Sequence, residues 1–176
     1  LINSCSDLML KIINNSKPII AEINGVATAA GCQLVASCDL AYSSENSKFA
    51  TPGVNIGLFC STPMVALSRV AKNKHAMEML LTGDFIQADK AKSIGLINNF
   101  FKEEYLTKET FLIANKIAKK SSLTLSIGKK AFYNQSEMKI SDAYKYASEV
   151  MIKNMMESDS EEGIKAFIEK RKPNWN

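Results

Sequence analysis

The segment from Pro18 to Asp39 limits the fold most strongly, because three kinds of local structure must follow one another within it. A short apolar run ends at Asn24-Gly25, which is typical of a buried strand that enters a tight turn. Small residues follow from Val26 to Gly31, and apolar residues then recur at helical spacing up to Cys38. The segment therefore predicts a strand, a small-residue turn and a helix in close succession.

Short strands and helices alternate over the first hundred residues. An amphipathic helix is expected to open the chain and to end near Asn15-Ser16. Further strands are predicted at 41–42, 48–50, 54–58 and 96–97, and helices at 63–70, 75–81 and 87–93. This alternation favours a parallel sheet with crossover helices.

After Phe101 the sequence predicts helices alone, at 106–119, 122–133, 140–156 and 160–170. Ser158 and Asp159 each stand three residues before a glutamate, which is the pattern of a capping box. The predicted domains are thus an α/β part, residues 1–101, and a helical part, residues 102–176. Because the helical part is too extended to bury its apolar stripes alone, we expect it to pack on another subunit.

Composition argues against several classes of protein. The 176 residues are 46% hydrophobic and 23% charged, which suits a domain with a packed core. A scattered net charge of +4 argues against nucleic-acid binding but would suit an anionic small ligand. Four cysteines without C-x-x-C spacing and a single histidine, His75, predict neither a metal site nor a disulfide framework. No apolar run approaches the roughly 18 residues of a membrane-spanning helix.

The small residues that precede the helix have a possible chemical use. The first N–H groups of a helix have no partner inside it and carry positive partial charge. Small side chains let a ligand oxygen approach these groups, and a thioester carbonyl that becomes an enolate is one such ligand. Close packing of the helix on the strand is the alternative explanation of the same residues.

The complete string from Pro18 to Asp39 resembles the signature of the crotonase superfamily, the enoyl-CoA hydratase/isomerase family. The family pattern there is P-x-I-A-x-x-N-G-x-A-x-G-G-G-x-E-L-x-x-x-C-D. Further matches follow in order at 49–52, 56–58, 67–69, 78–83, 88–97 and 162–173, so the resemblance spans almost the whole chain. It implies an α/β, crotonase-like (ClpP/crotonase) spiral core with a C-terminal helical trimerisation region.

The resemblance also implies a ligand, an acyl-CoA thioester. Coenzyme A arrives as part of that ligand, and no permanently bound cofactor is implied. Family members hold the thioester enolate between two backbone N–H groups, and the second donor corresponds to Ala30, with Gly31 at the helix start. Three residues, Phe167, Lys170 and Lys172, correspond to the last helix, which reaches toward CoA in the family; a solvated helix end is the alternative for them.

A homotrimer or a dimer of trimers, a role in fatty-acid metabolism and a location in the mitochondrial matrix are implied by the same resemblance. The chain begins at Leu1 rather than Met. The resemblance puts the first N–H donor, and the strands that carry it, before this residue. We therefore expect a partial sequence without its targeting segment, and no acyl-CoA turnover by these 176 residues alone, since loss of one such donor costs about 10²–10³ in rate.

Two positions depart from the hydratase pattern. The two glutamates that hold water and move protons in hydratases correspond to Gln33 and Gly53, and neither residue can transfer a proton. The aspartate position of dienoyl-CoA isomerases falls near Ser61. Ordinary hydration is therefore not expected, and two functions stay open. One is a CoA-thioester enzyme that relies on the oxyanion hole, and the other is an inactive acyl-CoA-binding or regulatory homologue.

Three other side chains could belong to a site or to the scaffold. Glu22 either faces solvent or is an interior carboxylate, and the first is favoured. For Asp39 we expect a hydrogen-bond acceptor at a helix end or a turn. Cys60 lies near the family's catalytic loops, but no base accompanies it, so a buried small side chain is expected.

Overall fold

The computed structural model describes residues 2–175 and divides the chain into two compact units. The first unit runs up to Ile13 and continues over Ile19–Ala114. The second contains Asn14–Pro18 and the residues from Asn115 onward. The functional division predicted between residues 101 and 102 stays a prediction.

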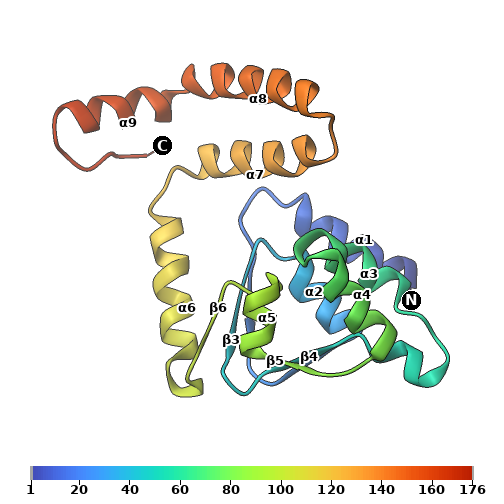
Figure 1. Ribbon diagram of the computed structural model, residues 1–176. Helices are drawn as coiled ribbons and strands as arrows, with labels where there is room; N and C mark the ends of the chain where they lie inside the picture. The colour runs from blue at the N-terminus through green and yellow to red at the C-terminus, as the bar shows by residue number, and fades with distance from the viewer. Residues whose placement is uncertain (1, 176) are drawn as a thin grey trace. The chain divides into compact units, whose positions relative to one another are not determined.

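Two three-stranded sheets form the frame of the first unit (Figure 1). In one sheet, all strands run parallel in the order β1 (Ile20–Ile23), β3 (Leu40–Ser44) and β6 (Asn99–Phe101). In the other, β2 (Val26–Thr28) pairs in parallel with β4 (Lys48–Ala50), and β4 pairs antiparallel with β5 (Ile86–Gln87). The parallel pairing expected from the alternating pattern is therefore present in both sheets.

Helices cover these sheets, and α2 is the one that packs between other helices and a strand. The first unit contains α1 (Ile2–Ile13), α2 (Ala30–Ser37), α3 (Ser61–Val70), α4 (Asn73–Thr82) and α5 (Ala88–Ile94). Helix α2 packs against α1, α3 and β2. Its core-facing side chains, Cys32, Val35 and Ala36, join a buried cluster that includes Phe49, Leu67 and Leu80. The strand, turn and helix predicted from the Pro18–Asp39 segment are therefore confirmed, with β2 as an additional strand inside the small-residue run.

Two predicted strands are wrong. The apolar run at 54–58 forms a 3-10 helix, η1 (Pro52–Ile56), which ends at Gly57 with φ 76°. Proline at its start and a left-handed glycine at its end favour a tight turn over an extended strand. Leu96 donates its N–H to the carbonyl of Ala91 at 2.9 Å, so that group closes helix α5 and does not join a sheet. The strand begins only at Asn99.

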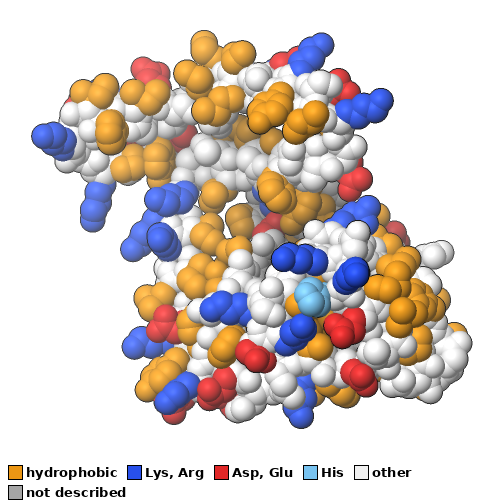
Figure 2. Space-filling view, viewed as in Figure 1, with side chains coloured by type: hydrophobic (Ala, Val, Ile, Leu, Met, Phe, Trp, Pro, Cys, Tyr) orange, Lys and Arg blue, Asp and Glu red, His pale blue; other side chains and the backbone are white. Residues whose placement is uncertain are grey.

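The second unit is helical, and α6 (Glu103–Ala118) runs into it from the first. Helices α7 (Ser122–Ser136) and α8 (Ile140–Met155) lie side by side, and α9 (Ser158–Ile168) follows (Figure 1). Large apolar side chains on these helices are exposed, some of them on the face in Figure 2: Phe132, Ile140, Tyr144, Met151, Ile152, Met155, Met156, Ile164, Phe167 and Ile168. Their packing on another subunit stays a prediction.

Helix α9 begins where the sequence predicts, but its N-cap residue is neither Ser158 nor Asp159. The N-cap residue is Glu157, whose side chain forms no cap hydrogen bond. Asp159 is instead buried and accepts a hydrogen bond from the Ser121 hydroxyl at 2.5 Å. Across residues 2–175, no helix is both long enough and apolar enough to span a membrane.

Candidate functional site

The turn between β2 and α2 is held in an unusual backbone conformation at Ala29. This residue has φ 47° and ψ −113°, a region that residues with a Cβ rarely adopt. Its N–H donates to the carbonyl of Ala50 at 3.0 Å, and its carbonyl accepts the N–H of Gln33 at 3.0 Å. The neighbouring strand β4 and the first turn of α2 therefore fix the strained residue from both sides.

The backbone N–H groups of Ala30 and Gly31 follow this turn directly. The bond from Gln33 to Ala29 closes the first turn of α2, so the N–H groups of the three residues before Gln33, Ala30 to Cys32, have no carbonyl partner inside the helix. Ala30 is exposed, and a Cβ added at Gly31 would meet only the Cβ of Ala27 at 4.0 Å. The geometry leaves room for an electronegative atom to approach the positive end of the helix.

Gln33 lies one turn further along α2 and is only 4% exposed. Its Oε1 accepts a weak hydrogen bond from the thiol of Cys5 in α1, with 3.8 Å between sulfur and oxygen. The backbone carbonyl of Gln33 accepts the hydroxyl of Ser37 at 2.8 Å. The carboxamide is thus an interior polar group, able to donate or accept a hydrogen bond but unable to exchange a proton.

Gly53 lies in η1, where the chain leaves no room for any side chain. A Cβ at this residue would stand 2.8 Å from the sulfur of Cys60 and still closer to the backbone oxygen of Leu58. The Gly53 N–H donates to that same sulfur at 3.3 Å, and its carbonyl accepts the N–H of Leu58 at 2.9 Å. We call residues 53–60 the closed turn. Sequence reasoning recognised the missing side chain at Gly53 but not that the space for one is filled.

Two of the remaining candidates are parts of the scaffold. Glu22 is exposed, as favoured from the sequence, and its Oε1 accepts the hydroxyl of Thr107 at 2.7 Å. Asp39 accepts the N–H of Ile19 at 2.7 Å and so joins the starts of β1 and β3. Its predicted role as a turn acceptor is confirmed.

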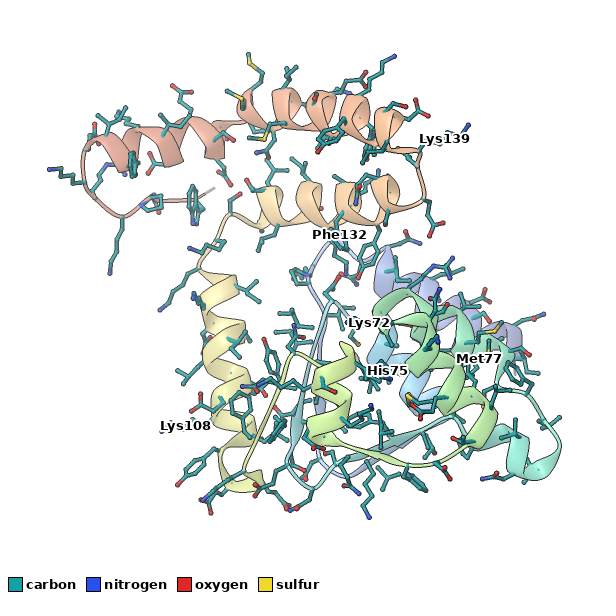
Figure 3. The ribbon with its side chains drawn as sticks, viewed as in Figure 1. Lys72, His75, Met77, Lys108, Phe132 and Lys139 are labelled. Carbon is teal, nitrogen blue, oxygen red and sulfur yellow. The ribbon has the colours of Figure 1, made fainter. Side chains whose placement is uncertain are left out.

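The cysteines and the histidine do not form a nucleophile–base pair. Cys60 is 8% exposed, which confirms it as a buried small side chain, and Ser61 beside it donates to the carbonyl of Phe59. Burial, with Cys60 nearby, raises the pKa of the Cys32 thiol to about 12. His75 lies in the first turn of α4 beside Lys72 (Figure 3), with its Nδ1 3.7 Å from the Glu78 carboxylate. Among residues 2–175, no group of three or more potential metal ligands gathers.

The second unit holds the other predicted binding residues. Phe167, in the last turn of α9, is 84% exposed. Lys170 follows the helix, is exposed and has a left-handed backbone with φ 56°. Next to it, Arg171 forms ion pairs with the carboxylates of Glu162 and Glu169, each at 2.6 Å.

Comparisons with known proteins match the chain over nearly its full length. The sequence model of a family described as enoyl-CoA hydratase/isomerase matches residues 2–176. "Enoyl-CoA hydratase domain-containing protein 3, mitochondrial" from Xenopus laevis is 53% identical over 98% of this chain and 59% of its own length. The human protein of the same name is 50% identical over 98% of this chain and 57% of its own length. The chain thus spans less than two thirds of these relatives.

Solved structures show the same fold. The crystal structure of human enoyl coenzyme A hydratase domain-containing protein 3 superposes with a TM-score of 0.97 at 50% identity, covering 99% of this chain and 69% of that one. An enoyl-CoA hydratase from Mycobacterium smegmatis also superposes with a TM-score of 0.97, at 47% identity, over 99% and 68% of the two chains. The predicted crotonase-like fold is therefore confirmed.

Proposed function

The chain belongs to the enoyl-CoA hydratase/isomerase family, and from this we propose that it binds an acyl-CoA thioester with the carbonyl oxygen at the N–H of Ala30. The observation that carries this proposal is the start of α2. There the N–H of Ala30, an exposed residue, follows a strained turn, and a Cβ at the neighbouring Gly31 would meet no atom closer than 4.0 Å. Coenzyme A enters as part of the ligand, and the proposal includes no permanently bound cofactor.

A backbone donor at this point favours thioester chemistry that builds negative charge on the carbonyl oxygen. When a proton leaves the carbon beside the carbonyl, or a bond to that carbon breaks, the oxygen becomes an enolate oxygen. An N–H fixed at a helix start is already oriented toward that charge and does not have to reorganise during the reaction. One such donor typically contributes about 10²–10³ in rate.

Neither hydratase glutamate position supplies an acid or a base. Gln33 is a buried amide, and Gly53 lies in the closed turn, which has no space for a carboxylate. The proposed chemistry therefore takes its proton transfers from water or from the substrate. The closed turn also favours a second candidate, an inactive homologue that binds acyl-CoA without turning it over.

Calorimetry with crotonyl-CoA on the full-length protein, together with a hydration assay on the same thioester, tests these functions. Absence of binding would contradict both candidates. Binding followed by turnover of some CoA thioester supports the enzyme, and binding without turnover of any thioester supports the inactive homologue. Hydration of crotonyl-CoA at the rate of an ordinary hydratase would contradict the role assigned to Gln33 and Gly53.

The role of Ala30 has its own test. Ala30→Pro removes the N–H at the first position of the helix, which tolerates proline, although proline also restricts the backbone of Ala29 before it. Ala30→Gly keeps the N–H and is the matched control. We expect weaker crotonyl-CoA binding only in the proline variant, with circular dichroism to check its fold. Independently of any variant, the amide NMR signal of Ala30 should shift when crotonyl-CoA is added. An unmoved signal in a chain that binds the thioester would contradict the role.

The proposal also includes a location and an assembly. The relatives above are named mitochondrial, and we propose the mitochondrial matrix and fatty-acid metabolism for this chain. The exposed apolar side chains of α7–α9 support a homotrimer or a dimer of trimers. Light scattering on the purified chain would test this, since a monomer at all concentrations would contradict it.

A further inference from the structure

The sequence contains a single Asn-Gly pair, Asn24-Gly25, which lies between the end of β1 and the start of β2. An asparagine followed by glycine is chemically labile, because the glycine nitrogen can reach the side-chain amide with no Cβ in the way. Asn24 is exposed and Gly25 is partly exposed, so water reaches both residues. A Cβ built at Gly25 would meet no atom of residues 2–175 within 4 Å, so packing does not prevent a ring from closing here.

Hydrogen bonds hold the Gly25 backbone in place instead. Its N–H donates to the Ser47 hydroxyl at 3.2 Å, and its carbonyl accepts the N–H of Lys48 at 3.0 Å. The Ser47 hydroxyl also donates to the carbonyl of Ile23 at 3.0 Å. One buried side chain thus joins the backbone groups on both sides of Asn24, and it engages the nitrogen that would attack the amide.

The Ser47 hydroxyl uses its full capacity for hydrogen bonds. A hydroxyl has one proton to donate and two lone pairs that accept. Because the Ser47 proton goes to Ile23, Ser44 must be the donor in the 3.0 Å contact between the two serine hydroxyls. Ser47 is 0% exposed and Ser44 is 1% exposed, so solvent does not compete for these bonds. Ser47 is therefore fixed in direction, and its loss would release the Gly25 N–H.

We propose that Asn24 is a site of spontaneous deamidation and that the Ser47 hydroxyl sets the rate of the reaction. The Gly25 nitrogen forms a bond to the side-chain carbonyl carbon of Asn24, its proton passes to the side-chain nitrogen, and ammonia leaves. Water then opens the resulting succinimide at one of its two carbonyl groups and gives aspartate or isoaspartate. Water is the only co-reactant. The proposal goes beyond acyl-CoA binding and does not depend on it.

The products would alter the chain just before the candidate site. Isoaspartate inserts one carbon atom into the main chain between β1 and β2, and β2 leads into the strained turn at Ala29. Aspartate keeps the backbone but brings a second carboxylate to Glu103, whose Oε1 accepts the Asn24 amide at 3.3 Å. Restraint of the reaction by Ser47 therefore protects the backbone that positions the start of α2.

The test follows the exchange of the Asn24 amide for a carboxyl group by peptide mass spectrometry at pH 8. Ser47→Ala should raise the rate by about two- to tenfold, the range of one lost hydrogen bond. Ser44→Ala is the matched control and should stay close to the unaltered chain, because it removes an equally buried hydroxyl but leaves the bond from Gly25 to Ser47. A Ser47→Ala variant that reacts no faster, or a Ser44→Ala variant that reacts equally fast, would overturn the proposal.

A second measurement does not depend on how well the variants fold. The unaltered chain should lose the Asn24 amide several-fold faster in guanidinium chloride than in its folded state, because unfolding releases the Gly25 N–H. Asn24→Asp has no amide to lose at this residue and identifies the mass of the product peptide. Equal rates in the folded and unfolded chains would overturn the restraint, and a stable Asn24 amide in both states would overturn the site itself.

Discussion

The N–H of Gly53 donates to the sulfur of Cys60 at 3.3 Å, and that sulfur lies in the space that a side chain at residue 53 would need. The same turn is closed by the bond from the Leu58 N–H to the Gly53 carbonyl. A hydratase glutamate at this position is therefore not only absent but sterically excluded.

Gly53→Ala should destabilise the protein by about 1–3 kcal/mol, because the added methyl group overlaps a backbone oxygen that cannot rotate away. Gly53→Glu should cost at least as much, and adding Gln33→Glu should not create hydration of crotonyl-CoA. Denaturant unfolding measures the first effect. Gly31→Ala is the matched control, since its methyl group meets only ordinary contact and should leave stability unchanged or raise it by up to ~1 kcal/mol. A Gly53→Ala variant as stable as the unaltered chain would show that the turn opens freely.

Gln33→Glu should lose stability as pH rises. The side chain at this position is 4% exposed, and burial raises the pKa of a carboxyl group above its ordinary value near 4.3. Below about pH 4 the introduced carboxyl is neutral in both folded and unfolded chains, so the variant should lie close to the unaltered protein. Above that pH the introduced carboxyl of the folded state must either keep its proton or bury a charge. The free energy of unfolding should therefore fall by about 1–4 kcal/mol at pH 7 relative to the unaltered protein.

Thermal unfolding from pH 3 to pH 8 measures this trend in Gln33→Glu. The uncharged variant Gln33→Met provides the comparison, since its loss of thermal stability should not vary with pH in this way. A constant difference between Gln33→Glu and the unaltered chain across the range would mean that the site is more hydrated than its burial indicates.

Cys32 should resist alkylation while the protein is folded. Its side chain is 1% exposed, and burial raises the pKa of its thiol from 9.0 to about 12, so both access and thiolate formation are suppressed. At pH 8, iodoacetamide followed by mass spectrometry should modify the partly exposed Cys5 and Cys38 first. In denaturant all four cysteines should react at similar rates. Rapid modification of Cys32 in the native protein would contradict the packing of α2.

Ionisation of the Cys32 thiol should also lower the stability of the folded protein at alkaline pH. Because the folded-state pKa is raised, the contribution of the protonated thiol is fully present below about pH 9 and is lost as pH rises from 9 toward 12. Cys32→Ala should therefore flatten the fall of the unfolding midpoint in this range, although it lowers the midpoint at pH 7 through lost packing. A parallel fall in both proteins would assign alkaline unfolding to other groups.

Ser121→Ala should lower the free energy of unfolding by about 1–3 kcal/mol. The Ser121 hydroxyl accepts the N–H of Thr124 at the start of α7 and donates to the buried carboxylate of Asp159 at 2.5 Å, so the substitution removes a helix cap and one partner of a buried charge. The neighbouring Ser122→Ala, at an exposed position, should stay within about 0.5 kcal/mol. Equal effects of the two substitutions in denaturant unfolding would contradict this account.

Local signals in the sequence located most helices and the parallel strands, but several structural details depend on contacts that no local pattern contains. The run at 54–58 has strand-like residues, yet Pro52 and Gly57 bend it into a 3-10 turn. Ser158 and Asp159 match a capping pattern, yet Asp159 accepts from a serine 38 residues earlier. The closure at Gly53 was equally hidden, because it depends on the Leu58 oxygen and the Cys60 sulfur, which only the folded turn brings together.

Part of the candidate site could likewise be predicted from local sequence, and part depends on distant contacts. The positions of Ala30 and Gly31 at the start of α2 follow from the small-residue run, because the helix must begin where the strand and its turn end. The strain at Ala29 depends instead on a bond to Ala50 in another strand. The ligand roles of Ala30, Phe167 and Lys170 stay predictions.

The closed turn also bears on how sequences of this family can change. A single substitution would place a glutamate at residue 53. The folded chain has no space for that side chain until the Leu58 carbonyl and the Cys60 sulfur have moved. An intermediate that acquires the glutamate before the turn rearranges would carry the full overlap. An ordinary hydratase and a protein with this turn therefore differ by more than the substitution at residue 53, because the backbone of the turn has to rearrange as well.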